Sequence, residues 1–460
     1  MDERVTRAIR HLKRRPAFVV VTGFALAIVG GTAVLTLPLS GAGRVRVPLP
    51  EAFFTATSAV CVTGLAVVDT STAWSTFGKL VLMVLVQIGG LGIMTVASLI
   101  AISLHRRLTI RSRRLTLVEA GALDPGDLRD VLRGVLTFSV GVEAVLAVVL
   151  ALRFWSTYDL DPATAVGHGL FHSVMAFNNA GFALYSDGLV RFATDWVVCV
   201  PIMVAVVIGG LGFPVLIELT NRRSSRRRAQ IGPPSRRLTL HTRLTLLVTA
   251  GLLVTGFVLT AAFEWTNPDT MGPLPGPAKL LAAAFHSVST RTAGFNTVDI
   301  GAMRETTWLF SEVLMFVGSG SASTGGGIKV TTLAVLLLVC VSEARGERDV
   351  TFSGRTIPSL VQRQALAVTL LSIAVAGAVT TVLLAANPIR LDEALFEVVS
   401  AFGTVGLSAG ITPTVDSVSR LALIFMMFFG RLGPLTLGYA FIARSRDRLF
   451  EYPEERPLVG

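Results

Sequence analysis

The chain of 460 residues is 52% hydrophobic and only 15% charged, with a mean hydropathy of +0.66. It is therefore too apolar for an ordinary water-soluble protein and long enough for several membrane crossings. Its net charge of +11 would suit nucleic acid, but the basic residues stand between apolar runs and not beside base-stacking aromatics, so we expect no nucleic-acid partner. Three scattered cysteines without a CxxC pair indicate neither a disulfide framework nor a zinc site.

Eight long apolar runs follow one another along the chain, and each is about long enough to cross a bilayer as a helix. They occupy residues 17–38, 78–104, 131–154, 195–219, 244–263, 307–341, 364–386 and 419–443. Within each successive pair lies a shorter, half-apolar segment: EAFFTATSAVCVTGLAVVDT, GLFHSVMAFNNAGFALYSDG, AAFHSVSTRTAGFNTVDIGAM and ALFEVVSAFGTVGLSAGITP. None of the four can span a bilayer, so we expect each to enter the membrane and return on the same side.

Arginine-rich stretches, such as NRRSSRRRAQIGPPSRR, alternate with segments that carry acids and few basic residues. The positive-inside rule then predicts cytoplasmic termini and basic loops, with the four short segments facing outward. The basic loop is either a solvated determinant of topology or a docking surface for a partner.

Glycines recur in the four short segments at intervals of 117, 113 and 112 residues, at Gly64, Gly181, Gly294 and Gly406. The runs that follow carry further glycines 24 to 28 residues later, at Gly89, Gly209, Gly318 and Gly430, within sequences such as IGGLG and FGRLG. The simplest explanation is four divergent copies of one unit. We place repeat 1 at residues 1–104, repeat 2 at 105–222, repeat 3 at 223–343, repeat 4 at 344–443 and a cytoplasmic tail at 444–460.

Four glycine-bearing loops around an axis can point backbone carbonyls inward and replace the hydration shell of an ion. Glycine permits unusual backbone angles there and adds no side chain to block the path. Non-helical backbone at membrane depth is also tolerated only beside protein or a watery cavity. The predicted fold is an all-α integral membrane protein with four tandem helix, re-entrant pore loop and helix repeats, eight spans in total, around a pseudo-fourfold central pore. Four unrelated surface-loop glycines are the alternative.

The stretches AVCVTGLAVVDT, FNNAGF, STRTAGFNT, GTVGLS, GSASTGGGIK and GRLGPLT together resemble the Trk/Ktr/HKT superfamily of potassium transporters, with the bacterial KtrB type the most similar. The resemblance extends from about residue 15 to 443. It implies a multi-pass protein of the bacterial inner (plasma) membrane that serves as the pore-forming subunit of a K+ uptake system.

By this resemblance, K+ is held at backbone carbonyls of the four loops and at no other metal site. The residues that match the filter are Cys61, Val62, Thr63 and Gly64; Asn178, Asn179, Ala180 and Gly181; Arg291, Thr292, Ala293 and Gly294; and Gly403, Thr404, Val405 and Gly406. All four loops keep the glycine, which implies preference for K+ over Na+. We expect the Arg291 side chain to turn away from the axis and donate hydrogen bonds to the scaffold around the filter.

The resemblance also identifies a gate. It consists of Gly318, Ser319, Gly320, Ser321, Ala322, Ser323, Thr324, Gly325, Gly326 and Gly327, an intramembrane loop below the filter, together with Lys329 and Arg431. The glycines suit an unwound stretch, and the hydroxyls suit a hydrated cavity. Lys329 either stabilises the closed loop or extends toward the cytoplasm. Arg431 either restrains ions below the filter or forms a structural salt bridge.

His172 and His286 hold matching places in two short segments, which favours bracing of the scaffold over metal binding or catalysis, and we expect no enzyme. The chain carries no nucleotide-binding motif, so it binds no cofactor, and any nucleotide acts through a regulatory partner. The family implies a ring of Rossmann-like cytoplasmic subunits of KtrA/TrkA type under a membrane homodimer, with Arg226, Arg227, Arg228 and the tail as docking surfaces. Dependence on Na+ and the choice between channel and symporter stay open, and an ion-coupled secondary transporter of another solute is the alternative function.

Overall fold

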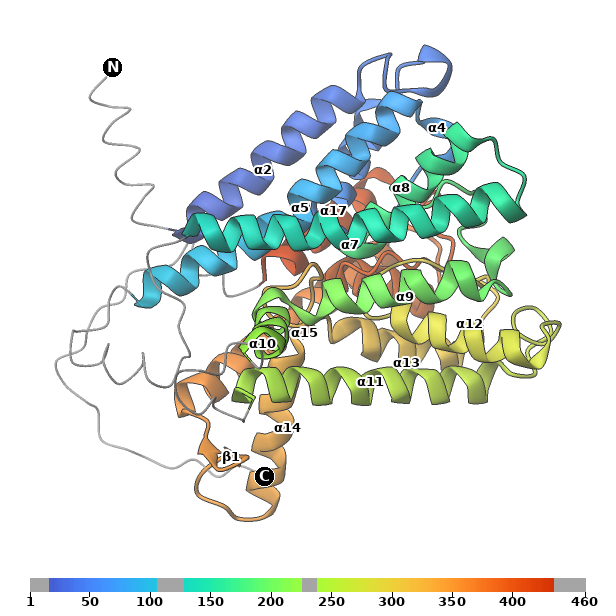
Figure 1. Cartoon of the computed structure of the whole chain (residues 1–460). Helices are drawn as coiled ribbons and strands as arrows, with labels where there is room; N and C mark the ends of the chain where they lie inside the picture. The colour runs from blue at the N-terminus through green and yellow to red at the C-terminus, as the bar shows by residue number, and fades with distance from the viewer. Residues whose placement is uncertain (1–15, 106–127, 226–237, 434–460) are drawn as a thin grey trace.

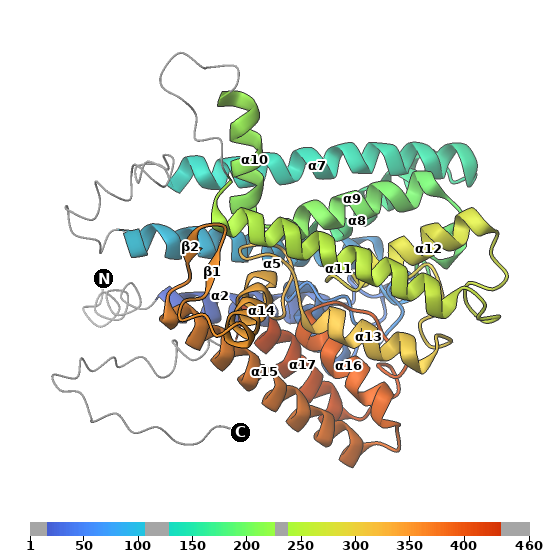
Figure 2. The ribbon, with the colours of Figure 1, turned by 90° about the horizontal axis from the view of Figure 1, so that it is seen from below.

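The computed structural model describes residues 16–105, 128–225 and 238–433, and this part of the chain is almost entirely helical (Figure 1). The longer helices are α2 (Pro16–Leu35), α5 (Thr76–His105), α7 (Leu128–Thr157), α9 (Trp196–Leu211), α11 (Leu240–Glu264), α13 (Glu305–Phe316), α14 (Val330–Ala344), α15 (Ser359–Ala386) and α17 (Ser417–Leu432). Helices α7, α9 and α11 run side by side in both views (Figures 1 and 2). The predicted all-helical membrane fold is confirmed.

Four further helices overlap the four short segments of the sequence, and we call them the short helices: α3 (Leu49–Val60), α8 (Pro162–Asn178), α12 (Gly276–Ser289) and α16 (Leu391–Gly403). The other elements among the described residues are η1 (Ala42–Arg44), α4 (Thr70–Ala73), η2 (Val190–Phe192), α10 (Phe213–Ser225) and the hairpin of β1 (Thr351–Phe352) with β2 (Arg355–Thr356). The four short helices are packed against long ones, for example α8 against α7 and α12 against α11.

Local sequence explains where the short helices begin. Proline occupies one of the first two positions of α3, α8 and α12, where its missing N–H costs no helical hydrogen bond. The side chain of Asp161 also caps α8 by accepting a hydrogen bond from Thr164 N. At the start of α16, the side chain of Glu393 accepts a hydrogen bond from the backbone N–H of Arg390 and so caps the helix. All four helices therefore start at defined residues.

By length and hydropathy, three helices among the described residues suit a membrane crossing: α11, α15 and residues 133–157 of α7. A fourth is obtained if α9 and the start of α10 form one broken span. Shorter apolar helices lie at Val20–Leu35, Thr76–Gly92 and Val330–Ala344. The count of eight spans therefore stays a prediction.

One expected span is not continuous. The run at residues 195–219 was expected to form a single helix, but the chain bends by 101° between α9 and α10. The bend lies at Gly212, whose φ of 89° and ψ of 145° are incompatible with a helix. The run at 307–341, in contrast, is interrupted where its glycines and serines predict, between α13 and α14.

The described residues place apolar side chains on the outside and polar ones in the middle. Leu247, Val254 and Val258 of α11 are exposed, as are Leu370 and Ile373 of α15. The fully buried polar side chains include Thr63, Asn178, Asn179, Thr292 and Thr404. This arrangement suits a lipid-facing surface around a polar interior.

Candidate ion pathway

Each of the four short helices is followed by an extended segment in which the same position has an unusual backbone conformation. Two residues before each of the four aligned glycines, a residue with a side chain has positive φ: 57° at Val62, 60° at Asn179, 86° at Thr292 and 49° at Thr404. Such angles are uncommon outside glycine and persist only where the surroundings impose them. Sequence reasoning did not identify this position, because three of the four residues are β-branched and such side chains disfavour positive φ.

The four glycines lie against one another's segments in a closed order, which we call the glycine ring (Gly64, Gly181, Gly294 and Gly406). A Cβ atom added to Gly64 would lie 2.5 Å from the backbone N of Gly181, and one on Gly181 would lie 2.7 Å from Cα of Gly294. A Cβ on Gly294 would lie 2.2 Å from the carbonyl O of Val405, and one on Gly406 would lie 2.1 Å from the carbonyl O of Thr63. The structure thus brings all four predicted segments to one place, and no side chain fits at the ring.

Serine side chains near the ends of the short helices hold these segments. The Oγ of Ser58 accepts a hydrogen bond from Gly64 N at 3.0 Å, and the Oγ of Ser400 accepts one from Gly406 N at 3.1 Å. The Ser289 hydroxyl donates to the carbonyl of Phe295 in the third segment. These bonds hold the backbone on either side of the ring, and they do not use the carbonyl groups of the ring glycines.

The second set of aligned glycines allows the long helices to approach the short ones. A Cβ on Gly89 would lie 2.0 Å from the carbonyl O of Val60, one on Gly209 would lie 2.1 Å from that of Phe177, and one on Gly430 would lie 1.8 Å from that of Phe402. All three carbonyls belong to the residue four places before a ring glycine. Gly318 differs, because its Cβ would meet the carbonyl O of Gly326 within the loop that it begins.

The loop at residues 318–327, which we call the gate loop, is bonded to several elements around the pathway. Its backbone N–H groups at Gly320 and Thr324 donate to carbonyls of α9, those of Gly210 at 2.8 Å and Gly209 at 3.2 Å. The N–H of Gly326 donates to the side chain of Thr404 at 2.8 Å, directly beside the fourth ring segment. Inside the loop, the hydroxyls of Ser319 and Ser323 bond to each other at 2.5 Å, and Ser321 bonds to Thr331 at 3.1 Å.

Three cations contact the gate loop and bond to carbonyls. Arg431 is buried and donates to the carbonyls of Thr324 and, at 2.6 Å, Gly89. Arg291 donates to the carbonyl of Val317 and, at 2.6 Å, to that of Gly318. Lys329 donates to the carbonyl of Gly325 at 2.7 Å. Among the described residues, none of the three has a carboxylate partner, so a structural salt bridge at Arg431 is not observed there.

Three of the four short helices carry a phenylalanine, Phe171, Phe285 or Phe396, followed by a residue that braces the helix. His172 of α8 accepts a hydrogen bond from Leu184 N at 3.3 Å, His286 of α12 bonds to Ser311 at 3.0 Å, and Glu397 of α16 accepts one from Thr412 at 3.0 Å. Both histidines were expected to brace the scaffold. Glu397 was not identified from the sequence, although it follows Phe396 as His172 follows Phe171.

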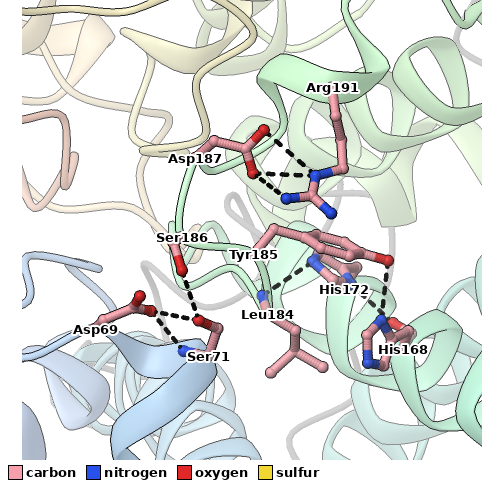
Figure 3. Close-up of polar contacts among 9 residues, drawn as sticks. All are labelled: Asp69, Ser71, His168, His172, Leu184, Tyr185, Ser186, Asp187 and Arg191. Carbon is pink, nitrogen blue, oxygen red and sulfur yellow. Dashed lines mark hydrogen bonds and ion pairs between the residues drawn. The ribbon is translucent and has the colours of Figure 1, made fainter.

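Figure 3 shows the bracing around α8. The Tyr185 ring stacks on the His172 ring with 5.5 Å between the ring centres, and its hydroxyl bonds to His168 at 2.9 Å. The guanidinium carbon of Arg191 lies over the Tyr185 ring, 4.5 Å from its centre. The Ser71 hydroxyl donates to Asp69 and bonds to Ser186, which joins the loops after α3 and α8. Partial burial raises the pKa of Asp69, but hydrogen bonds from Ser186 and Ser71 outweigh it and hold the pKa below its usual value.

Some expected sites lie elsewhere. Arg226, Arg227 and Arg228 and the tail at residues 444–460 fall outside the described residues. Across residues 16–105, 128–225 and 238–433, no three His, Cys, Asp or Glu side chains are grouped as metal ligands.

Comparison with known proteins agrees with these observations. The family model TrkH, described as a cation transport protein, matches residues 14–452. The Ktr system potassium uptake protein B of Bacillus subtilis is 37% identical over 458 residues, which cover 99% of each chain. The protein of the same name from Vibrio alginolyticus is 37% identical over 442 residues, 96% of this chain and 94% of the relative.

A solved structure supports the fold. The potassium transporter TrkH from Vibrio parahaemolyticus superposes with a TM-score of 0.70 over 92% of this chain and 83% of that one, at 18% sequence identity. The expected KtrB-type resemblance and the expectation of a transporter in place of an enzyme are confirmed by the family and its relatives. The chain belongs to the TrkH family of cation transport proteins.

Proposed function

We propose that this protein is the pore-forming subunit of a K+ uptake system in the cell membrane. The observation that carries the proposal is the glycine ring, where four separate segments meet with bare backbone and no side chain between them. The names of its relatives, the Ktr system potassium uptake proteins B, support K+ as the transported ion.

The selectivity filter is formed by the carbonyls of the four segments that end at the ring: residues 61–64, 178–181, 291–294 and 403–406. The carbonyls replace the water around a K+ ion, and a fixed ring of backbone dipoles discriminates against other cations. The left-handed residue two places before each glycine supports this reading, because it changes the direction of the chain at the same point of each segment. Four tandem repeats with the boundaries given above would supply the four segments.

The gate loop and Arg431 close the pathway next to the filter. Arg431 holds the loop to α5 through Thr324 and Gly89, and Thr404 ties the loop to the fourth filter segment. A buried guanidinium also repels cations. A charge within the membrane domain is costly, so its presence there favours a functional role. Lys329 adds a second positive charge that is bonded to the loop.

The system includes further parts. The name Ktr system, carried by relatives, supports a complex of several components. We propose that a homodimer of this chain docks on a cytoplasmic ring of Rossmann-like KtrA/TrkA-type subunits, that both termini are cytoplasmic, and that nucleotide acts only through that ring. Charge reversal at Arg226, Arg227 and Arg228 would then weaken co-purification with the ring, and unchanged co-purification would remove these residues from the interface.

The test is cation flux into liposomes that hold the purified protein, with K+ and Na+ compared for four proteins: the wild type, Gly64→Ser, Arg431→Ala and a deletion of residues 319–326. K+-selective flux that loses selectivity in Gly64→Ser and rises in the other two variants supports the filter and the gate. If no variant passes a monovalent cation, the pore is rejected, and solute-coupled transport becomes the function to test.

A further inference from the structure

A buried polar cluster joins the first residue of the second filter segment to two side chains that have no part in the function proposed above. It contains Glu143 of α7, Gln87 of α5 and Asn178, the last residue of α8. Glu143 is 6% exposed and Asn178 is fully buried. A carboxyl group in this position is costly, because it has left water for the interior of a membrane protein.

The three side chains form a closed triangle of hydrogen bonds. The Oε1 atom of Glu143 accepts from Gln87 Nε2 at 3.0 Å and from Asn178 Nδ2 at 3.1 Å, and its Oε2 atom accepts from Gln87 Nε2 at 3.3 Å. The Oε1 atom of Gln87 accepts from Asn178 Nδ2 at 2.7 Å. Asn178 Nδ2 also donates to the carbonyl of Val174 at 2.9 Å.

The charge of the cluster is balanced only by amides. In the described part of the chain, Glu143 forms no ion pair with Lys, Arg or His. Both amides thus hold the carboxyl group of Glu143, and these hydrogen bonds are stronger when the carboxyl group is ionised. Its own backbone carbonyl also accepts a bond from Ser173 of α8 at 2.5 Å, which ties the same two helices a second time.

The cluster fixes a residue whose backbone is part of the proposed filter. Asn178 is followed by Asn179 with φ of 60°, so the chain turns out of the helix directly after the clamped side chain. The glycine at position 90 leaves the room that the clamp needs, because a Cβ there would lie 1.9 Å from Asn178 Oδ1. The direction of the peptide that joins residues 178 and 179 therefore depends on the amide of Asn178.

The other filter segments have no such clamp. The positions that match Asn178 are Cys61, Arg291 and Gly403. Cys61 and Gly403 have no side-chain amide, and Arg291 is bonded to the gate loop. Among the four segments, the second is the one that has a side chain bonded to a carboxyl group on a neighbouring long helix, Glu143 of α7.

We propose that Glu143 and Gln87 are positioning residues for ion selectivity, which orient the second filter segment by clamping the side chain of Asn178. The inference rests on the proposed K+ filter and adds residues that do not touch the ion. Replacement of the carboxylate by an amide would keep the shape of the cluster and remove its charge, so the clamp would weaken without opening a cavity.

The test compares Glu143→Gln, Gln87→Glu and the double exchange Gln87→Glu/Glu143→Gln, in the full chain. The readout is the ratio of K+ to Na+ flux in liposomes, or, for a closed wild type, the ratio of the Na+ concentration to the K+ concentration that gives half-maximal thermal stabilisation. We expect Glu143→Gln to lower this ratio about tenfold, which corresponds to about 1.4 kcal/mol. The double exchange restores one carboxylate and one amide, so it should recover most of the loss.

A matched control is Glu264→Gln. Glu264 is also a fully buried glutamate with an amide and hydroxyl donors, Asn267, Thr270 and Thr307, but it lies at the end of α11 and not beside the filter. It should lose stability and keep the wild-type ion ratio. If Glu143→Gln cannot be purified folded, Gln87→Met removes an amide of the same cluster from a half-exposed site and carries the test.

An unchanged ion ratio in Glu143→Gln or Gln87→Met, with the wild type still selective for K+, overturns the positioning role and leaves the filter intact. An equal loss in Glu264→Gln overturns it too, since general destabilisation would then suffice. A wild type that neither passes nor binds K+ rejects the filter itself, and the inference with it.

Discussion

At the scale of single residues, Gly64 is constrained in two separate ways. Its φ of 93° is strained for any residue with a side chain, and its Cβ position is occupied by the backbone of Gly181. We expect Gly64→Ala to lower both K+ flux and K+ selectivity several-fold, because the second segment must shift. Flux assays with paired K+ and Na+ gradients measure both.

The control separates backbone strain from the contact. Gly346 has φ of 66° and no atom within 4 Å of its Cβ position. Gly346→Ala should therefore cost about 1 kcal/mol of stability and leave selectivity unchanged. Equal selectivity in Gly64→Ala and the wild type would show that the ring does not contact the ion.

Arg431 of α17 joins the gate loop to α5. Its guanidinium donates to two carbonyls on different elements, those of Thr324 and Gly89. The ammonium group of a lysine is a compact point charge and would not bridge both carbonyls in the same way. We expect Arg431→Ala to raise K+ flux in the absence of a regulator about tenfold, since loss of about 1.4 kcal/mol of closed-state stabilisation shifts the open population by that factor.

Arg420 provides a control on the same helix. It lies in the first turn of α17 and donates to the carbonyls of Val415 and Pro413, both in the loop just before it. Arg420→Ala removes the same charge without touching the gate loop, so flux should stay at the wild-type level. Flux that rises equally in both variants would assign the effect to net charge and not to the gate.

At the scale of elements, the bend between α9 and α10 brings the chain against the gate loop. Gly212 has a Cβ position 2.4 Å from the carbonyl O of Ser321, and the next residue donates from Phe213 N to the carbonyl of Ala322 at 3.1 Å. We expect Gly212→Ala to displace the loop and raise flux without a regulator by severalfold. Liposome flux of the purified variant measures this.

Gly433 tests whether strain alone is responsible. It caps α17 with nearly the same backbone angles, φ of 81° and ψ of 143°, but none of the residues described up to position 433 places an atom within 4 Å of its Cβ position. Gly433→Ala carries the same conformational cost and should leave the gate closed. An increase in flux of the same size in both variants would contradict a role for the contact with Ser321.

The contrast between Gly212 and Gly433 also shows which features of the structure the sequence could predict. The similar motifs IGGLG and FGRLG indicated a repeat, and the structure shows that Gly89, Gly209 and Gly430 in these motifs lie against backbone carbonyls of the short helices. They did not predict that Gly212 ends a helix, because apolar periodicity is the same on both sides of the bend. The break is imposed by the gate loop, which is more than 100 residues away in sequence.

The sequence also could not predict the role of side chains whose partners lie far away along the chain. Glu143 stands in an apolar run where a single carboxyl has no local explanation, and its partners come from α5 and α8. Three of the four left-handed residues before the ring glycines, Val62, Thr292 and Thr404, have β-branched side chains that disfavour positive φ, so no pattern marked this position. The ring glycines could be predicted because the same residue type recurs in each copy, and the gate loop because its glycines and serines interrupt an apolar run.

At the scale of the whole molecule, the glycine ring joins segments from the entire length of the chain. The first and last of them touch, since the Cβ position of Gly406 lies 2.1 Å from the carbonyl O of Thr63. An ion bound by all four segments would therefore link parts of the protein that are far apart in sequence. Binding that is confined to the folded state stabilises it in proportion to the logarithm of ion concentration.

We expect K+ to raise the temperature of unfolding of the purified protein, with a stabilisation of about 2.7 kcal/mol at a concentration one hundred times the dissociation constant. Na+ and a large organic cation at the same ionic strength provide the comparison, because screening of the +11 net charge is common to all three salts. Gly64→Ala should lose the K+-specific part, whereas Gly346→Ala should keep it on a lower baseline. Identical unfolding temperatures in K+ and Na+ for the wild type would mean that the four segments do not bind the ion together, even if each of them lines its path.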